Sequence, residues 1–224
     1  MNKYLKDVLS GFLAGFFIGL GGLAYVVSKN GIGELGQLIG ALCFPIGLFM
    51  VCSFGVNLYT GKIGYLFNKE VNQFKTLDFL IMLIANLVGA MSIGLISYLM
   101  FINNQSMLDT ASAVASSRTV EQNIGGLFGA FFKSMVCGMC VYIAVNLFKK
   151  CNNYAERFLV VLIPIFLFVY TGMNHCIADF YYISFGLSFG IQNLLFILIP
   201  IVGNSVGAIL FDRALYLLTK VSNK

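Results

Sequence analysis

The sequence predicts an all-α membrane protein with six transmembrane helices, of which the second and fifth are broken. Hydrophobic residues make up 59% of the 224 residues and charged residues only 10%, whereas soluble domains carry roughly 25% charged residues. Apolar runs of about 20 residues recur, and each is long enough to cross the ~30 Å hydrocarbon layer as a helix. The net charge of +5 comes from short loops between these runs. We therefore expect a lipid bilayer as a partner, and no nucleic acid.

Short polar loops separate the apolar runs, and none is long enough for a separate soluble domain. Hydropathy places the spans at approximately 8–28, 36–59, 78–103, 122–148, 157–187 and 190–218, with loops at 28–36, 68–77, 103–123 and 149–157. Residues 1–7 lead directly into the first span without a small-residue cleavage pattern, so we expect no separate signal peptide. The sequence thus predicts a single transmembrane domain over residues 1–224.

Glycines interrupt the second and fifth spans. The second contains a run that starts at Phe44-Pro45 and ends in Gly55-Val56-Asn57, and in the fifth Gly172-Met173-Asn174 leads to His175, the single histidine. Non-helical backbone at membrane depth is tolerated only where protein or a water-lined cavity satisfies it. An ionisable group at that depth is by default a functional-site hypothesis, although a satisfied packing histidine is the plain alternative. We expect both breaks to face a pathway.

The two halves of the chain repeat one pattern. Gly55-x-Asn57 recurs as Gly172-x-Asn174 at an offset of 117 residues. The motif Asn86-Leu87-Val88-Gly89-Ala90 recurs as Asn204-Ser205-Val206-Gly207-Ala208 at an offset of 118. In spans one and four, Gly15-Phe16-Phe17-Ile18-Gly19 is matched to Ala130-Phe131-Phe132-Lys133-Ser134 at an offset of 115. Three similar offsets indicate an internal duplication.

The topology follows from this duplication and from the basic residues. Each half, about 1–105 and about 118–224, holds three spans, and an odd number turns the second copy upside down. Inverted repeats with paired broken helices are typical of transporters and channels, in which the substrate site lies where the two breaks meet. Eleven basic residues share the side of the two termini, whereas the other side carries only Lys29 and Arg118. The positive-inside rule then places both termini in the cytoplasm, as expected for a multi-pass protein of a bacterial cytoplasmic membrane.

The six cysteines predict neither disulfides nor a metal site. Five of them, Cys43, Cys52, Cys137, Cys140 and Cys176, fall within apolar stretches, which is typical of small buried residues. Cys137 and Cys140 form a C-x-x-C, but no second cysteine pair or histidine lies at metal-ligand spacing. We expect no cofactor.

Four motifs together resemble the formate/nitrite transporter family. They are Phe44-Pro45-Ile46-Gly47 through Gly55-Val56-Asn57-Leu58-Tyr59-Thr60-Gly61, then Phe131-Phe132-Lys133-Ser134-Met135-Val136-Cys137, then Gly172-Met173-Asn174-His175-Cys176-Ile177-Ala178, and finally Ile199-Pro200 with Gly203-Asn204. The resemblance implies an aquaporin-like fold and a homopentamer with a pore through each protomer. It also implies passage of small monovalent anions such as formate, nitrite, hydrosulfide or lactate.

The resemblance further implies roles for individual residues. Thr60 and His175 would form a central polar pair, Asn204 would lie near it, and Lys133 would be a basic residue below the pore centre. Two apolar constrictions would flank the pair, one formed by Phe44, Leu48 and Phe168 and the other by Leu58, Tyr59 and Val141. Without the resemblance, ordinary core packing explains the apolar set, and Thr60 could bond to a carbonyl one turn earlier.

Four positions depart from the family pattern. Asn57 replaces a common acidic residue, Asn174 a common Glu before the histidine, Gly138 a common Asn and Asp179 another common Asn. Three of these positions stay candidate polar residues of the path, namely Asn57, Asn174 and Asp179. The sequence leaves their effect on selectivity open. Asp179 lies four residues after His175 and can reach the same helix face. We expect it either to pair with the imidazole or to be held by backbone donors, because an unpaired carboxylate at that depth is costly.

The favoured hypothesis is a channel or transporter for small weak-acid anions, with formate and nitrite first. An anion entering a dry constriction loses hydration worth many kcal/mol, more than one hydrogen bond returns. Lys133 and the amide ends of the half-helices would supply positive potential. His175 can donate a hydrogen bond or a proton, so that the anion crosses the narrowest point nearly neutral.

Three alternatives stay open. Within the family, hydrosulfide or lactate could be the substrate. A neutral-solute channel of aquaporin type would fit paired half-helices but usually carries paired Asn-Pro-Ala loops, which this sequence lacks. An intramembrane enzyme using His175 with Cys176 is disfavoured, because adjacent helical residues point about 100° apart. We therefore expect no enzymatic activity.

Overall fold

The computed structural model describes residues 2–119 and 124–222, and its secondary structure is helical throughout that part of the chain. In chain order the elements are α1 (Lys3–Cys43), α2 (Pro45–Phe54), α3 (Tyr59–Lys62), the 3-10 helix η1 (Ile63–Phe67), α4 (Thr76–Met100), α5 (Gln105–Arg118), α6 (Ile124–Lys150), α7 (Tyr154–Tyr170), α8 (Cys176–Phe185), α9 (Ile191–Phe196) and α10 (Leu198–Ser222). The prediction of an all-helical protein is confirmed.

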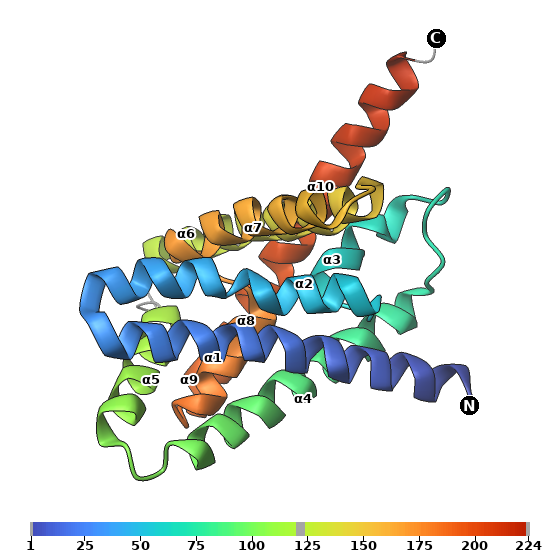
Figure 1. Cartoon of the computed structure of the whole chain (residues 1–224). Coiled ribbons are helices and arrows are strands. Elements are labelled where there is room, and N and C mark those ends of the chain that lie inside the picture. Colours follow the sequence, from blue (N-terminus) through green and yellow to red (C-terminus); the bar gives the residue numbers. More distant parts are fainter. Residues whose placement is uncertain (1, 120–123, 223–224) are drawn as a thin grey trace.

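The first long helix reverses direction within itself. Ile32 (φ −142°, ψ 28°) and Gly33 (φ +58°, ψ −127°) leave the helical region. Glycine adopts such a positive φ without the steric cost that a side chain brings. Figure 1 shows α1 folding back at this point and continuing into α2, which begins with Pro45 at its first position. The loop predicted at 28–36 is therefore a single sharp turn between helical segments.

Four helical stretches within the described residues are long and apolar enough to cross a membrane. They are Lys3–Phe54, Thr76–Met100, Ile124–Lys150 and Ile191–Lys220. The first of them joins α1 to α2 and contains the reversal. The predicted fifth span lies in α7 and α8, which are 17 and 10 residues long and separated by a turn.

The predicted loop at 103–123 contains a helix within its described residues, and residues 120–123 lie outside the described part of the chain. Asn104 caps the start of α5 by accepting the Met107 N–H at 3.1 Å, as a good N-cap residue does. Met107, Ala111, Val114 and Arg118 are all buried, and their spacing places them on one face of the helix. This face packs toward α8. The polar composition of the segment concealed this buried face.

Two equivalent helix pairs form the body of the protein, α1 against α4 and α6 against α10. A Cβ atom on Gly15 would lie 1.8 Å from the Asn86 backbone oxygen, and one on Gly138 would lie 2.1 Å from the Asn204 backbone oxygen. Small residues allow such close backbone contact between membrane helices. Gly15 thus corresponds to Gly138, 123 residues on. The predicted match of span one to span four at an offset of 115 is wrong by eight residues.

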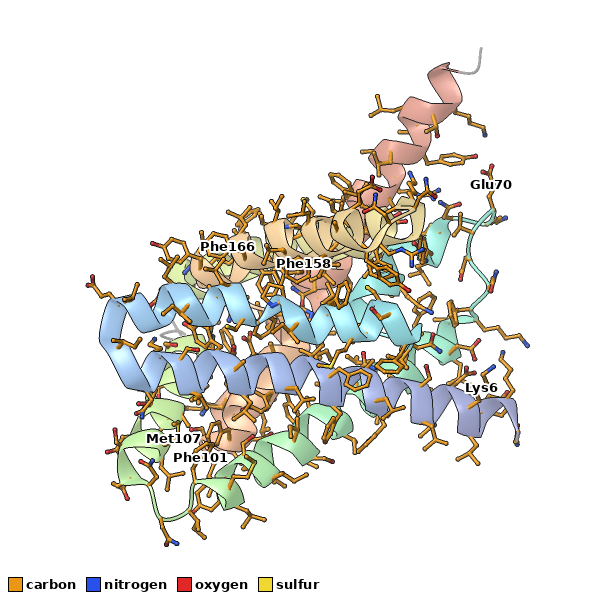
Figure 2. All side chains as sticks on the ribbon, viewed as in Figure 1. Lys6, Glu70, Phe101, Met107, Phe158 and Phe166 are labelled. Atoms are coloured by element: carbon orange, nitrogen blue, oxygen red, sulfur yellow. The ribbon has the colours of Figure 1, made fainter. Side chains whose placement is uncertain are left out.

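The bundle has two distinct ends. Figure 2 shows Lys6 and Glu70 at the end where the N-terminus lies, and Phe101 and Met107 at the opposite end, close to α5. We call the first the basic end and the second the α5 end. The C-terminal half of α10 projects beyond the bundle (Figure 1). The candidate site lies between these two ends.

Candidate functional site

Two glycine turns bring two helix N-termini into the interior. Gly55 (φ +66°) ends α2, and Gly172 (φ +68°) lies just after α7. The same bonds close both turns: Val56 N–H donates to Val51 O at 3.1 Å, and Met173 N–H donates to Phe168 O at 3.0 Å. Both patterns match the common glycine stop of a helix. After each turn a new helix begins inside the protein, α3 at Tyr59 and α8 at Cys176.

An asparagine from a neighbouring helix holds each turn. Asn86 of α4 accepts the Tyr59 N–H at 2.7 Å and donates to Gly11 O and Asn57 O at 2.8 and 2.9 Å. Asn204 of α10 accepts the Cys176 N–H at 2.9 Å and donates to Ser134 O and Asn174 O at 2.8 and 2.9 Å. Each amide thereby satisfies two backbone groups of the turn and ties the turn to a carbonyl of a neighbouring helix, α1 or α6. Asn204 binds the backbone of the residues before and after His175 and so holds the histidine in place from both sides.

The structure brings Thr60 and His175 together at the centre. Thr60 Oγ1 lies 2.9 Å from His175 Nε2, and the two residues are 0% and 1% exposed. His175 Nδ1 accepts the backbone N–H of Ala178 at 3.2 Å. A ring nitrogen that accepts carries no proton, so the proton of the neutral ring resides on Nε2 and is donated to Thr60. The start of α8 therefore fixes which nitrogen of His175 faces its partner.

Buried aromatic side chains pack against this pair. Phe44 and Phe168 meet edge to face with ring centroids 5.8 Å apart, and Phe168 stacks on the His175 ring at 5.8 Å. The six predicted constriction residues are all buried, namely Phe44, Leu48, Phe168, Leu58, Tyr59 and Val141. Tyr59 also carries a polar contact, because its hydroxyl lies 2.8 Å from Ser205 Oγ.

Arg118 lies beside the central pair, on its α5 side, and sequence reasoning had left it in a loop. Together with His175, Asp179 and Phe168 it lines a small gap in the interior. Its Nη1 donates to Met173 O at 3.1 Å, and its guanidinium stands 5.1 Å from the centroid of the Tyr182 ring. Arg118 is 6% exposed, and its Nε has no partner among the described residues. The four-residue spacing of buried positions along α5 was the signal for its burial.

The ion pair expected between Asp179 and His175 is not formed. Asp179 Oδ2 accepts from Asn174 Nδ2 at 3.0 Å and is stabilised by the His175 backbone N–H. Both ring nitrogens of His175 are already occupied by Thr60 and Ala178. Asp179 is instead held by an amide and a backbone donor, and Arg118 is a nearby opposite charge. Of the two arrangements expected for Asp179, the structure therefore has the one with a backbone donor, and Asn174 is a further donor to the carboxylate.

Asn174 joins the two charged residues of this region. Its Nδ2 donates to Asp179 Oδ2 and also to the backbone oxygen of Arg118, both at 3.0 Å. At 3% exposure the side chain is buried between α5 and α8. The two positions that depart from the family pattern on α7–α8 are thus in direct contact.

The other predicted polar residues lie further away. Asn57 N–H donates to Ser10 Oγ at 2.8 Å, and Asn57 Oδ1 accepts from Lys62 Nζ. Lys133 is exposed on α6 and has no partner among the described residues. A role for Lys133 in the path therefore stays a prediction. The cysteines are free, and within the described residues no group of three His, Cys, Asp or Glu side chains could hold a metal ion.

Comparisons with known proteins give one consistent result. A family model described as formate/nitrite transporter matches residues 2–218. A probable formate transporter of Methanothermobacter thermautotrophicus is 26% identical over 94% of this chain and 87% of its own length. The uncharacterized transporter YrhG of Bacillus subtilis is 29% identical over 92% of this chain and 82% of its own. The formate channel FocA of Escherichia coli is 25% identical over 82% and 67%.

Solved structures show the same fold. A pentameric formate channel with formate bound superposes with a TM-score of 0.82 at 20% identity, covering 97% of this chain and 98% of that one. The aquaglyceroporin from Plasmodium falciparum reaches a TM-score of 0.65 at 18% identity, covering 94% and 95%. At these identities the likeness concerns the fold alone. An aquaporin-like arrangement of helices accounts for both matches.

Proposed function

Because this chain belongs to the formate/nitrite transporter family, we propose that it moves small monovalent weak-acid anions, formate or nitrite first, across the cytoplasmic membrane. The apolar helices and the family make it a multi-pass membrane protein. The proposed path runs from the α5 end past Arg118, through the Thr60–His175 pair, and past Leu58 to the basic end. Hydrosulfide or lactate is the alternative substrate within the same family.

The buried Thr60–His175 contact carries this proposal. It places two hydrogen-bonding side chains between apolar layers, where an anion without partners would be strongly destabilised. His175 Nε2–H and the Thr60 hydroxyl can turn from each other toward an anion that arrives between them. When the ring has first taken up a proton from the aqueous side, the imidazolium can pass one from Nε2 to a weak-acid anion. This transfer makes the anion neutral for the dry part of the path and leaves the neutral imidazole. On the far side the acid releases its proton to water.

Arg118 supplies the attraction on the α5 side in this proposal. A buried guanidinium raises the local concentration of anions far more than an exposed one, because solvent screens it less. Asp179 and the Tyr182 ring lie close enough to temper its charge. The anion is thereby drawn toward His175 without being trapped. The gap around His175 has no room for a water molecule, so side chains such as Phe44 and Phe168 must move during passage.

We further propose that five copies assemble, each with its own path. The solved formate channel of the same fold is pentameric, and many large apolar side chains are exposed on the single chain, among them Phe54, Phe128 and Leu99. Lipid and neighbouring copies would share the covering of these surfaces. The basic end would face the cytoplasm, together with both termini.

A neutral-solute channel is the second candidate, because the aquaglyceroporin has the same fold. The two candidates separate in one experiment with purified protein in liposomes. Uptake of formate, nitrite, hydrosulfide, lactate, chloride and glycerol is compared at two pH values, with protein-free liposomes correcting for direct permeation of the neutral acids. We expect formate and nitrite to exceed chloride and to enter faster at the lower pH. Glycerol uptake without anion flux would contradict the proposal.

A further inference from the structure

A second cavity lies between Leu58 and the basic end, away from the Thr60–His175 pair. Its volume is about 90 Å³, which is room for a few water molecules or one small anion. Its walls are mostly apolar, with Val51, Leu58, Val145 and Phe148 among them, and its polar side chains are Cys52, Lys62 and Lys149. We call this space the inner cavity.

Neutral groups alone bind the two lysines of the inner cavity. Lys62 Nζ donates to Asn57 Oδ1 and stands 5.0 Å from the centroid of the Phe74 ring. Lys149 Nζ donates to Tyr65 Oη at 3.1 Å. Asn57 is neutral, so Lys62 has an amide oxygen and not a counter-charge as its hydrogen-bond partner. The positive charge at this position is therefore left uncompensated by its direct partner.

The charge balance of the inner cavity is positive. None of the lining residues in the described part of the chain is Asp or Glu. Lys62 and Lys149 are close enough to repel one another, and Asp7 of α1, which does not line the cavity, is the carboxylate that acts on Lys62. Lys62 can form further hydrogen bonds, because its ammonium has three donors. Two ammonium groups that share one small cavity favour an anion between them.

We infer that the inner cavity is a second anion-binding site, which takes a small monocarboxylate with its charged group toward Lys62 and Lys149 and its carbon atoms against Val51 and Phe148. The apolar walls disfavour strongly hydrated divalent anions such as sulfate, since these lose more hydration than two lysines return. The inference deepens the proposed function and rests on it for the class of anion, but occupancy of this cavity does not require passage past His175. It can therefore be tested in protein that carries no flux.

Cys52 offers a reporter inside the same cavity, because its half-buried side chain lines the cavity together with Lys62 and Lys149. In a Cys43→Ser/Cys151→Ser background the remaining cysteines besides Cys52 are buried. Protein in lipid nanodiscs, open from both faces, is labelled with an anionic and a cationic methanethiosulfonate of similar size, and Cys52 modification is followed by intact mass. The quantity compared is the rate of the anionic reagent divided by the rate of the cationic reagent. We expect this ratio to be about tenfold higher for Cys52 than for a free thiol in solution.

Three matched comparisons complete the test. Lys62→Gln/Lys149→Gln should bring the ratio of rates to that of the free thiol, whereas Lys150→Gln should leave it unchanged, because Lys150 lines a different cavity beside Tyr142. Acetate should slow labelling of Cys52 at least twofold in the parent and not in the double lysine variant, and sulfate at equal ionic strength should not. Equal rates for the two reagents, no labelling by either, or no protection by acetate would overturn the inference.

Discussion

The two ring nitrogens of His175 have separate partners, so substitutions can separate their tasks. Nδ1 caps α8 through the Ala178 N–H, and Nε2 meets Thr60. Asparagine is a good N-cap residue but cannot transfer a proton. We expect His175→Asn to keep the fold while it removes the increase of formate flux at low pH. His175→Phe should lose both the flux and about 1 kcal/mol of unfolding free energy.

The measurement pairs liposome flux over a range of pH with thermal unfolding in detergent. Thr60→Val, which removes the hydroxyl and leaves the cap intact, is the matched control for stability. If the Asn variant kept the pH dependence of the parent, His175 would be a capping residue and no more.

Arg118 and Lys133 give a second prediction at the scale of single residues. Arg118 is buried beside His175, whereas Lys133 is exposed on α6. Arg118→Gln should reduce anion flux about tenfold, since a weakly screened charge near the path is lost. Arg118→Lys keeps the charge and should retain most of the flux. Lys133→Gln should change it less than twofold, and a larger loss from Lys133 than from Arg118 would reverse the assignment.

The central pair was predictable and its charged neighbours were not. His175 stood out as the single histidine after a glycine break, and the family resemblance paired it with Thr60. Arg118 was hidden, because a polar segment with no long apolar run looked like a loop, and only the spacing of its small apolar residues marked a buried face. The partner of Asp179 depended on competition with Asn174, which helix spacing alone does not reveal.

At the scale of elements, close helix packing depends on Gly138. A Cβ at this position would lie 2.1 Å from the Asn204 backbone oxygen, and Asn204 holds the turn before α8. We expect Gly138→Ala to lower the free energy of unfolding by about 1–3 kcal/mol and to reduce flux by displacing Asn204. Gly129→Ala, on the same helix with open space around it, is the control. Equal stability of the two variants in detergent would contradict this packing.

Elements were predictable where a local backbone signal marks them. Glycine turns after Phe54 and Tyr170 and the proline that starts α2 are such signals, and each lies at an observed helix boundary. The helix α5 depends on packing against α8 and α1, so hydropathy showed it as a loop. At 28–36 hydropathy showed a loop as well, although the chain reverses there within two residues, Ile32 and Gly33. The repeat between spans one and four was misaligned because similar Phe-Phe letters were matched, whereas the observed equivalence comes from contact with Asn86 and Asn204.

At the scale of the whole molecule, every residue of the proposed path comes from one chain. Thr60 and His175 lie in opposite halves of the sequence and meet inside a single protomer, and the residues lining the inner cavity belong to that chain as well. Each asparagine clamp holds the turn of its own half, Asn86 the turn before α3 and Asn204 the turn before α8. The two halves meet at the Thr60–His175 contact. In the proposed pentamer, neighbouring copies would cover exposed apolar side chains such as Phe54 and Phe128.

Pentamers that mix active and inactive copies test this independence of the protomers. Wild-type chains are coexpressed with Arg118→Gln chains carrying a different tag, and native mass spectrometry establishes an assembly of five times the 24.6 kDa chain and the ratio of the two forms. Because the path lies within one protomer, formate flux should fall in direct proportion to the fraction of wild-type chains. A steeper fall would mean that copies cooperate in passage, and a different assembly mass would contradict the pentamer itself.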